Sequence, residues 1–322
     1  MKLQKSKILF DQIDYLMDLP QNIKNYPNII KLCQDVVYDI DSYRIAKLDV
    51  YCHEDYVDKL CPIVVNFHGG GFVAGDKYHR RSYASYLASL GYKVINVNYG
   101  LCPEYKFPAF LQHGGKAMFW IKQNAEFYKF DLNNIILSGD SAGAFIALAL
   151  TICSYNNSYR TAVECIDFNL KIKGVCLLCG AYIPSQAMDK KMIFDINKAL
   201  CCLVTGLEEN ELQNYSSYKY YNELDAGKFV DNNFPPTLII HSLKDIFCNG
   251  DAPLVIELFD KHNVPHREIC SLTNMHDWQE MQLTKSSKIV LEQIKIFLCD
   301  IVNNNISTEN NLKLTIKNGK IQ

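Results

Sequence analysis

The sequence predicts an α/β protein whose core is a mostly parallel, twisted sheet flanked by helices. Short apolar runs rich in β-branched residues alternate along the chain with stretches of helical spacing. Such an alternation of strand and helix requires parallel strands with helices on both faces of the sheet. Two glycine-rich motifs, at 68–72 and 139–143, each directly follow a strand-like run. We therefore expect the functional residues at the edge where the strands end.

The elements are expected in a regular order after an N-terminal segment of different character. In that segment, residues 1–34, apolar residues recur at helical spacing on either side of a break at 20–27, which predicts two short helices. Strands are expected as a pair within 36–52 and singly at 62–67, 92–97, 133–138, 170–179, 236–241 and 266–272. Helices are expected at 79–90, 109–124, 144–150, 253–261 and 286–298.

Two later segments depart from this order. Residues 183–231 are helix-like and contain a cluster of four tyrosines between 215 and 221. An insertion between two strands on the functional edge would form a lid, and a peripheral helical excursion is the alternative. The last residues, 301–322, are Asn-rich and then polar. They predict either a disordered tail or a short edge hairpin that turns at Asn318-Gly319.

The five residues Gly139-Asp140-Ser141-Ala142-Gly143 lie between a strand-like run and a helix-like run rich in Ala and Leu. A G-x-S-x-G motif in that context predicts a nucleophile elbow, a sharp turn that exposes the serine hydroxyl in a cleft. The N-terminus of the following helix would direct its N–H groups and its positive dipole end toward an anion formed there. The alternative is a tight helix-packing turn in which the serine is incidental.

The motif His68-Gly69-Gly70-Gly71-Phe72 directly follows the strand expected at 62–67. Three successive glycines leave backbone N–H groups unshielded, and an acyl-transfer enzyme needs such donors where its tetrahedral oxyanion forms. A strand that leads into this motif favours function over the alternative, a flexible turn. His68 itself is expected to brace the glycine loop by hydrogen bonds.

A serine nucleophile needs a base, and a histidine base needs a carboxylate that orients it and stabilises its charged form. The chain order Ser141, Asp245, His276 meets this need, because Asp245 and His276 each follow an expected strand. The strand ends of a parallel sheet share one edge, so the three residues can converge there. Asp140, beside the serine, is expected to pair with a charge rather than to act as a second base.

Three other residues compete for these roles. Asp251 is an alternative acid, but it lies further into the following helix. His266 is an alternative base, but it begins a strand and is expected to pack or hydrogen-bond there. His241 precedes the acid loop and would lie beside the site. We therefore expect Asp245 and His276 to be the functional pair.

Composition indicates the partners and the compartment. The net charge of −2 gives no sign that nucleic acid or an anionic membrane is the main partner. The first ten residues lack the apolar core of a signal peptide, and no stretch has the roughly 18 apolar residues of a membrane span. The thirteen scattered cysteines are expected to be free thiols in a cytoplasmic protein. Cys176 and Cys179 have C-x-x-C spacing but lie in an expected buried strand, so no metal site is expected there.

Together these motifs resemble those of the hormone-sensitive-lipase-like group of α/β-hydrolases, the microbial carboxylesterases with a His-Gly-Gly-Gly motif. The resemblance covers residues 36–300. It is carried by His68-Gly69-Gly70-Gly71-Phe72, Tyr99-Gly100-Leu101-Cys102-Pro103-Glu104, Phe107-Pro108-Ala109, Gly139-Asp140-Ser141-Ala142-Gly143, Asp245 and His276. It implies an α/β-hydrolase fold and a small-molecule ester as the substrate.

The resemblance also implies a mechanism and roles for individual residues. The chain would be a serine carboxylesterase for short-to-medium acyl esters, working through an acyl-enzyme without a metal or organic cofactor. The oxyanion would be bound by the N–H groups of Gly70, Gly71 and Ala142, with Gly69 as a further candidate. His68 and Asp140 would support this loop.

The same resemblance implies a division of the chain into parts. These are N-terminal cap helices at 1–34, a hydrolase core at 35–300 with a cap insertion at about 183–231, and a C-terminal tail at 301–322. A homodimer is compatible with it. Two alternative functions remain open: an arylformamidase or aryl-amide hydrolase with the same machinery, and a non-catalytic small-molecule binder, as some plant hormone receptors are.

Overall fold

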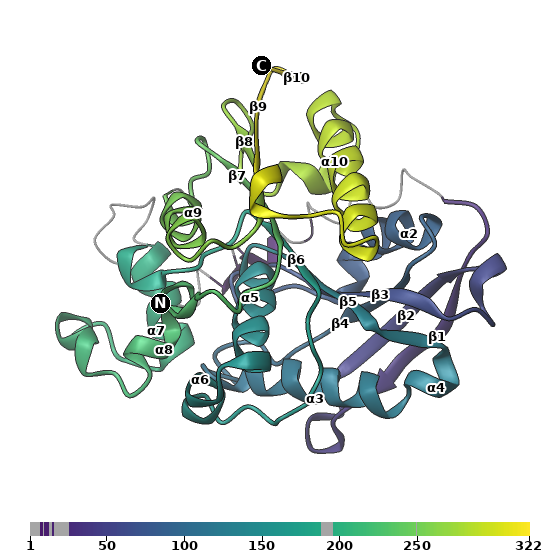
Figure 1. Ribbon diagram of the computed structural model, residues 1–322. Helices are drawn as coiled ribbons and strands as arrows, with labels where there is room; N and C mark the ends of the chain where they lie inside the picture. Colours follow the sequence, from purple (N-terminus) through teal and green to yellow (C-terminus); the bar gives the residue numbers. More distant parts are fainter. Residues whose placement is uncertain (1–6, 9, 13–14, 16–25, 188–195, 249) are drawn as a thin grey trace.

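Ten strands among the described residues form one sheet, and helices cover both of its faces (Figure 1). The computed structural model describes the chain except for residues 1–6, 9, 13–14, 16–25, 188–195 and 249. In spatial order the strands are β1 (Ile29–Val37), β2 (Lys47–His53), β4 (Lys93–Val97), β3 (Cys61–Phe67), β5 (Phe130–Asp140), β6 (Gly174–Leu178), β7 (Thr237–Ser242), β8 (His266–Ser271), β9 (Leu312–Lys317) and β10 (Lys320–Ile321). The strands from β4 to β9 run parallel, and β1, β2 and β10 pair antiparallel. The predicted, mostly parallel sheet is confirmed.

The helices divide between the two faces of the sheet. One face packs on α2 (Arg81–Ser89) and α10 (Lys285–Val302), and the other packs on α3 (Ala109–Gln123), α5 (Ala142–Tyr155) and α9 (Asp251–Lys261). The shorter helices are α4 (Ala125–Tyr128), α6 (Asn157–Ala162), α7 (Ile196–Thr205) and α8 (Tyr221–Leu224). The central strands bury apolar side chains on both of their faces because helices cover both faces. Along β3, for example, Val64 belongs to one core and Val65 to the other.

The β5–α5 unit lies at the centre of the molecule. Ile135, Ile136 and Leu137 of β5 are completely buried. In α5 every residue from Ala142 to Cys153 is buried. A helix that is apolar on all sides needs neighbours on all sides, and α5 lies against β3, β5, β6 and α3. The turn between β5 and α5 is therefore fixed by a well-packed strand before it and a well-packed helix after it.

The prediction of a second N-terminal helix is wrong over residues 29–34, because these residues belong to the edge strand β1. Two register shifts interrupt the pairing of β1 with β2, one between Lys31 and Cys33 and one between Cys33 and Val36. Because of these irregularities the consecutive residues Leu32 and Cys33 both pack on the same core. The strand thus lacks the strict alternation by which an edge strand is recognised in a sequence. The first expected helix falls largely outside the described residues; those between 7 and 15 that are described are helical.

Residues 312–321, expected within a tail, form strands. β9 pairs parallel with β8, and β10 pairs antiparallel with β9. Asn318 and Gly319 connect them with positive φ angles of 52° and 72°, the conformation that Asn-Gly favours in tight hairpins. The short hairpin considered from the sequence is thus present, and its first strand extends the central sheet.

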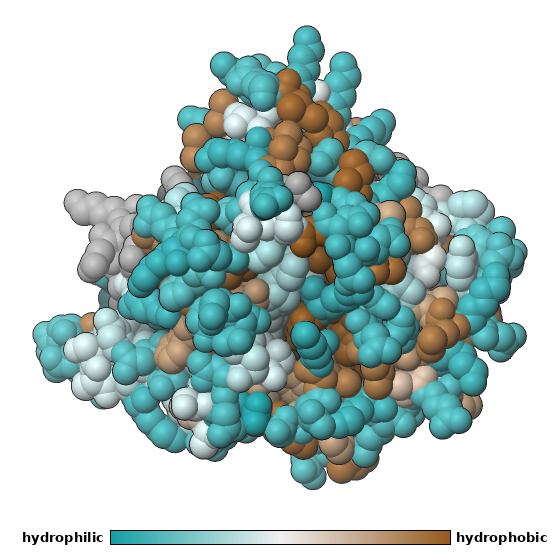
Figure 2. Space-filling model, viewed as in Figure 1, coloured by the Kyte–Doolittle hydropathy of each residue, from teal (hydrophilic) through white to brown (hydrophobic). Residues whose placement is uncertain are grey.

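The 183–231 insertion is helical in its described part. It contains α7 and α8 together with three short 3₁₀ helices, η5 (Pro184–Ala187), η7 (Leu212–Ser217) and η8 (Ala226–Phe229). Within the described ranges, every helix is too short or too polar to span a lipid bilayer. Hydrophilic residues predominate on the face shown in Figure 2, where hydrophobic residues lie in several separate patches.

Candidate active site

Ser141 occupies a sharp turn between β5 and α5. The strand ends at Asp140, the helix begins at Ala142, and Ser141 between them has a φ of 51° and a ψ of −115°. The small residues around it are required sterically, because a Cβ atom on Gly143 would lie 2.0 Å from the carbonyl oxygen of Phe67. A serine with a positive φ angle at a sharp strand-to-helix turn is characteristic of a nucleophile elbow.

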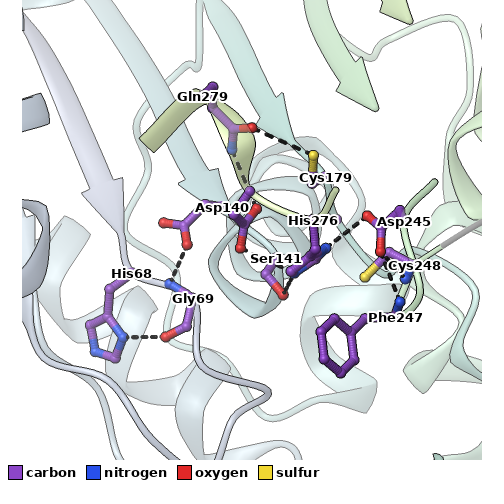
Figure 3. Close-up of polar contacts among 12 residues, drawn as sticks. His68, Gly69, Asp140, Ser141, Cys179, Asp245, Phe247, Cys248, His276 and Gln279 are labelled. Atoms are coloured by element: carbon purple, nitrogen blue, oxygen red, sulfur yellow. Dashed lines mark hydrogen bonds and ion pairs between the residues drawn. The ribbon is translucent and has the colours of Figure 1, made fainter. Parts of the chain in front are cut away.

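The side chains of Ser141, His276 and Asp245 form one hydrogen-bonded row (Figure 3). Nε2 of His276 lies 2.9 Å from Oγ of Ser141, and Nδ1 lies 2.7 Å from Oδ2 of Asp245. The three residues follow β5, β8 and β7, whose parallel arrangement brings their ends to one edge of the sheet. The structure therefore brings together the three residues that the sequence pointed to.

Asp245 is held in place by its own loop. Its Oδ1 atom accepts hydrogen bonds from the backbone N–H groups of Phe247 and Cys248, each 2.8 Å long. Burial acts to raise the pKa of Asp245, but the hydrogen bond and charge of His276 and these two N–H groups lower the pKa below its usual value. Asp245 is thus ionised at neutral pH, as the partner of an imidazolium must be.

The competing residues lie in other environments. Oδ2 of Asp251 is 3.1 Å from the backbone nitrogen of Tyr182, whose N–H it accepts. His241 lies on β7, with its Nε2 2.9 Å from Oε1 of Glu268. His266 begins β8, as expected. Each of these side chains has structural contacts of its own, so Asp245 and His276 remain the pair beside the serine.

His276 has a second carboxylate neighbour, Asp277, which the sequence analysis did not identify. Oδ2 of Asp277 lies 3.0 Å from Nε2 of His276, on the same nitrogen that faces Ser141. Burial alone would lower the pKa of His276, but the charge of Asp277 and the hydrogen bond to Asp245 outweigh it and raise the pKa to about 10. The only signal in the sequence was an acidic residue directly after the expected base.

Two of the three glycines of the 68–72 loop face the cavity beside Ser141. Gly70 and Gly71 line it together with Ala142 at the start of α5. The φ angles of Gly70 and Gly71 are 117° and 60°, and a Cβ atom on Gly70 would lie 2.2 Å from the carbonyl oxygen of Ala74. The loop conformation therefore depends on glycine at this position.

Gly69 has a different place from the one expected. Its N–H group donates a 3.0 Å hydrogen bond to Oδ2 of Asp140, and Gly69 is absent from the described residues that line the cavity. In this structure the amide of Gly69 thus ties the glycine loop to β5, whereas Gly70, Gly71 and Ala142 face the cavity. Asp140 also pairs with Arg80, at 2.8 Å to Nε and 2.5 Å to Nη2. Asp140 thus has the charge partner predicted for it, but the identity of that partner was not foreseen.

His68 braces the glycine loop from behind. Its Nδ1 atom lies 2.7 Å from the carbonyl oxygen of Gly69, and its ring stacks on Tyr99 with a centroid distance of 4.4 Å. The hydroxyl of Tyr99 donates a 2.7 Å hydrogen bond to the carbonyl oxygen of His68. These contacts give His68 the supporting position expected from the sequence.

An apolar cavity opens in front of Ser141. Phe10 of the N-terminal segment lies over Gly71 and against the ring of Phe247, 5.9 Å away between centroids. From the 183–231 insertion the cavity is lined by Leu200, Cys201, Val204, Tyr215 and Leu224. Of the tyrosine cluster, only Tyr215 is among these lining residues; Tyr218 and Tyr221 pack on its ring, and Tyr220 packs on Tyr218. Segments far from the core in sequence therefore shape the part of the site that would receive a substrate.

Two groups of three nitrogen, oxygen or sulfur donors lie close together among the described residues. One is His241, Glu268 and Cys270, and the other is Asp245, Cys248 and His276; within each group the donor atoms lie within 4.8 Å of one another. In both groups the imidazole and the carboxylate are already hydrogen-bonded to each other. We therefore assign neither group as a metal site.

Comparison with known proteins places the chain among hydrolases of this architecture. The sequence matches the BD-FAE family over residues 48–252, more than half of its length. Esterase B from Lactobacillus rhamnosis, in an inhibited form, is similar in structure with a TM-score of 0.80 and 20% identity, covering 94% of this chain and 97% of that chain. An esterase from Pyrobaculum calidifontis gives a TM-score of 0.73 and 20% identity, covering 94% of each chain.

A third similar structure is EstE1, a thermophilic carboxylesterase cloned from a metagenomic library. Its TM-score is 0.71 and its identity 16%, with coverage of 92% of this chain and 97% of that chain. At such identities the likeness establishes the fold, which is the α/β-hydrolase fold expected from the resemblance.

Proposed function

The chain belongs to the BD-FAE family, and from this premise we propose that it is a serine carboxylesterase for short-to-medium acyl esters. The observation that carries the proposal is the position of His276, with one ring nitrogen 2.9 Å from Oγ of Ser141 and the other 2.7 Å from Asp245. A hydroxyl, an imidazole and a carboxylate in this order are the parts required for nucleophilic acyl transfer. The esterase structures of the same fold support the choice of an ester as the substrate.

The proposed reaction consists of two acyl transfers. Oγ of Ser141 attacks the ester carbonyl carbon while Nε2 of His276 accepts the hydroxyl proton. His276 then gives this proton to the leaving alcohol as the carbon–oxygen bond breaks, which leaves an acyl-enzyme. His276 then takes a proton from water as the water oxygen attacks the acyl carbon, and returns this proton to Oγ of Ser141 as the bond from Oγ to the acyl carbon breaks, which releases the carboxylic acid.

Backbone N–H groups would stabilise the charge that develops on the carbonyl oxygen. Gly70, Gly71 and Ala142 are the candidates, because they line the cavity beside Ser141. Donors fixed in place before the reaction are effective because they need no reorganisation when the charge appears. The acyl chain would lie in the apolar cavity, with the 183–231 insertion and Phe10 as its cap.

The test is hydrolysis of p-nitrophenyl esters of increasing acyl length by the wild type, by Ser141→Ala and by Ser154→Ala. Ser154 lies on the same helix and bonds only to the carbonyl oxygen of Thr151 among the contacts described, so it provides a matched control. We expect Ser141→Ala to lower kcat by at least about 10⁴-fold, as loss of a serine nucleophile does. Ser154→Ala is expected to retain wild-type kcat.

The remaining outcomes separate the alternatives. If the folded wild type cleaves aryl formamides or aryl amides in preference to every ester, the proposed ester substrate is wrong. The assignment of Ser141 as the nucleophile is not affected by that outcome. If a fluorophosphonate fails to label Ser141 in folded protein, the non-catalytic binder is favoured. Equal ester hydrolysis by the wild type and Ser141→Ala would mean that the reaction occurs elsewhere.

A further inference from the structure

We propose that Asp277 is a further functional residue of the reaction, a second carboxylate partner of His276 that competes with Ser141 for Nε2 and sets the pH range in which this nitrogen can act as a base. The inference rests on the proposed function, since it concerns the same imidazole. Asp277 would thus act in the reaction in addition to Ser141, His276 and Asp245.

The geometry places one carboxylate on each nitrogen of a single imidazole. Nδ1 of His276 lies 2.7 Å from Oδ2 of Asp245, and Nε2 lies 3.0 Å from Oδ2 of Asp277 and 2.9 Å from Oγ of Ser141. Burial raises the pKa of Asp277 above its usual value, while the charge and hydrogen bond of His276 act to lower it. In its ionised form, Asp277 can only accept hydrogen bonds. Asp277 therefore favours a proton on Nε2, whereas a base that activates Ser141 needs a free lone pair on the same atom.

Asp277 is built into this position. Its backbone is left-handed, with a φ of 48° and a ψ of 29°, a conformation that Asp tolerates better than most residues. The residue is 6% exposed and lines the cavity in front of Ser141. Its other oxygen, Oδ1, accepts a 3.3 Å hydrogen bond from the side-chain amide of Gln279. The amide oxygen of Gln279 in turn accepts a hydrogen bond from the Cys179 thiol (Figure 3).

The other charged and titratable groups around His276 come from several elements. They are Asp245 after β7, Asp140 at the end of β5, Arg80 before α2, Cys179 after β6 and Cys248 in the acid loop. Asp140 and Arg80 are paired and act on Asp277 in opposite directions. Burial raises the pKa of both thiols, so they are neutral at pH 7. On the Nε2 side, Asp277 is therefore the carboxylate that governs the proton.

This arrangement has a consequence for each proton transfer. In the free enzyme the protonated Nε2 donates a hydrogen bond to Oδ2 of Asp277 and has no free lone pair, so it cannot accept the proton of Ser141. When that proton is lost to solvent, the lone pair on Nε2 becomes free to accept the proton of Ser141 as the bond from Oγ to the carbonyl carbon forms. Once Nε2 is protonated again, Asp277 stabilises it. The residue thus makes His276 a stronger base and moves its working range to higher pH.

The experiment measures the ionisation of His276 directly. The imidazole signals of His276, assigned by their loss in His276→Gln, are followed by NMR against pH in the wild type, in Asp277→Asn and in the control Asp41→Asn. Asn is isosteric with Asp but uncharged, and Asp41 is an exposed residue. The pH dependence of kcat/KM for a p-nitrophenyl ester is measured on the same three proteins.

We expect the wild-type His276 to titrate well above pH 7 and Asp277→Asn to lower the midpoint by at least about one pH unit. The ratio of kcat/KM at pH 7 to its alkaline plateau then rises by at least about tenfold, and Asp41→Asn changes neither quantity. A wild-type midpoint at or below 7 would overturn the proposal even if Asp277→Asn does not fold. A midpoint that moves by less than about 0.3 unit in Asp277→Asn would also overturn it.

The two readouts separate this proposal from the proposed function. If the NMR midpoint moves as expected but no ester is hydrolysed, the role of Asp277 stands and the ester assignment fails. If esters are cleaved through Ser141 but the midpoint stays in place, only the role of Asp277 fails.

Discussion

Arg80 and Asp140, the residue before Ser141, form a buried ion pair. The two side chains are 3% and 1% exposed, and Asp140 also accepts the N–H group of Gly69. Replacing Arg80 with Met would leave a carboxylate buried without its cation. Loss of one partner from a buried pair costs about 3–5 kcal/mol, so we expect Arg80→Met to lower the free energy of unfolding by that amount, as measured by urea denaturation.

The control is an ion pair on the surface. Lys295 and Glu292 are 3.1 Å apart on α10 and about half exposed, so Lys295→Met is expected to change stability by less than about 0.5 kcal/mol. If Arg80→Met were as mild as Lys295→Met, Asp140 would not depend on Arg80 for its charge compensation. Adding Asp140→Asn to Arg80→Met is expected to restore part of the loss, because the buried charge is then removed.

Single site residues could be predicted from the sequence where a local motif marks them. They could not be predicted where their role depends on a contact with a residue that is distant in the sequence. Ser141 could be predicted because its turn is encoded by the five residues around it. Asp245 and His276 could be predicted because each follows a strand of a parallel sheet. Arg80 could not, since only folding brings it to Asp140. The hydrogen bond from Gly69 to Asp140 could not be predicted either, because the sequence does not show which amide a carboxylate engages.

At the scale of secondary structure, the docking of β9 on the sheet can be tested on two residues of one strand. Ile316 is fully buried in the core beneath α10, whereas Leu312 at the start of the strand is 41% exposed. Removing a buried aliphatic side chain costs about 2–5 kcal/mol. We expect Ile316→Ala to lower the free energy of unfolding by about 2–4 kcal/mol and Leu312→Ala by less than about 1 kcal/mol.

Urea denaturation of the two variants gives the answer. Similar, small effects for both would mean that residues 312–317 do not pack on β8 and that the tail expected from the sequence is the better description. A large effect for Ile316→Ala alone supports the parallel pairing, in which the backbone oxygen of Ile316 accepts the N–H group of Leu272 at 2.9 Å.

Strands and helices of the core could be predicted because their patterns are strong and local. The apolar, β-branched run of β3 predicts a strand, and the Ala- and Leu-rich run of α5 predicts a helix. β1 could not be predicted, since its bulges break the alternation of its side chains. The place of β9 beside β8 could not be predicted either, because a pairing across the whole of α10 leaves no trace in the local sequence.

At the scale of the whole molecule, the buried His241 and the partly buried His276 link stability to pH. His241 on β7 is paired with Glu268 on β8, which in turn binds Lys313 on β9 at 2.9 Å. Burial lowers the pKa of His241, but its hydrogen bonds to Cys270 and Glu268 outweigh burial and raise the pKa to about 9. The pKa of His276 is raised to about 10. Both residues thus bind a proton more tightly in the folded chain than in the unfolded one.

The sign of the effect follows from this difference. A histidine with a raised pKa contributes its full stabilisation below the unfolded value of about 6.5 and loses it as the pH rises through the folded value. For His241 the loss falls between about pH 6.5 and 9 and amounts to at most about 3 kcal/mol. The free energy of unfolding of the wild type is therefore expected to decrease steadily across this range.

Urea denaturation at pH 6 and pH 9.5 isolates the part due to His241. His241→Gln is uncharged at every pH, so its stability is expected to fall by about 2–3 kcal/mol less than that of the wild type over this interval. His262→Gln serves as the control and is expected to follow the wild type, because the contacts described for His262, at the end of α9, do not include His241, Glu268 or Lys313. Parallel pH profiles for the wild type and His241→Gln would contradict the assignment. Buried thiols with raised pKa values, such as Cys179 and Cys248, add to the slope that remains in His241→Gln. The difference between the two proteins, in which these contributions cancel, is therefore the measure of His241.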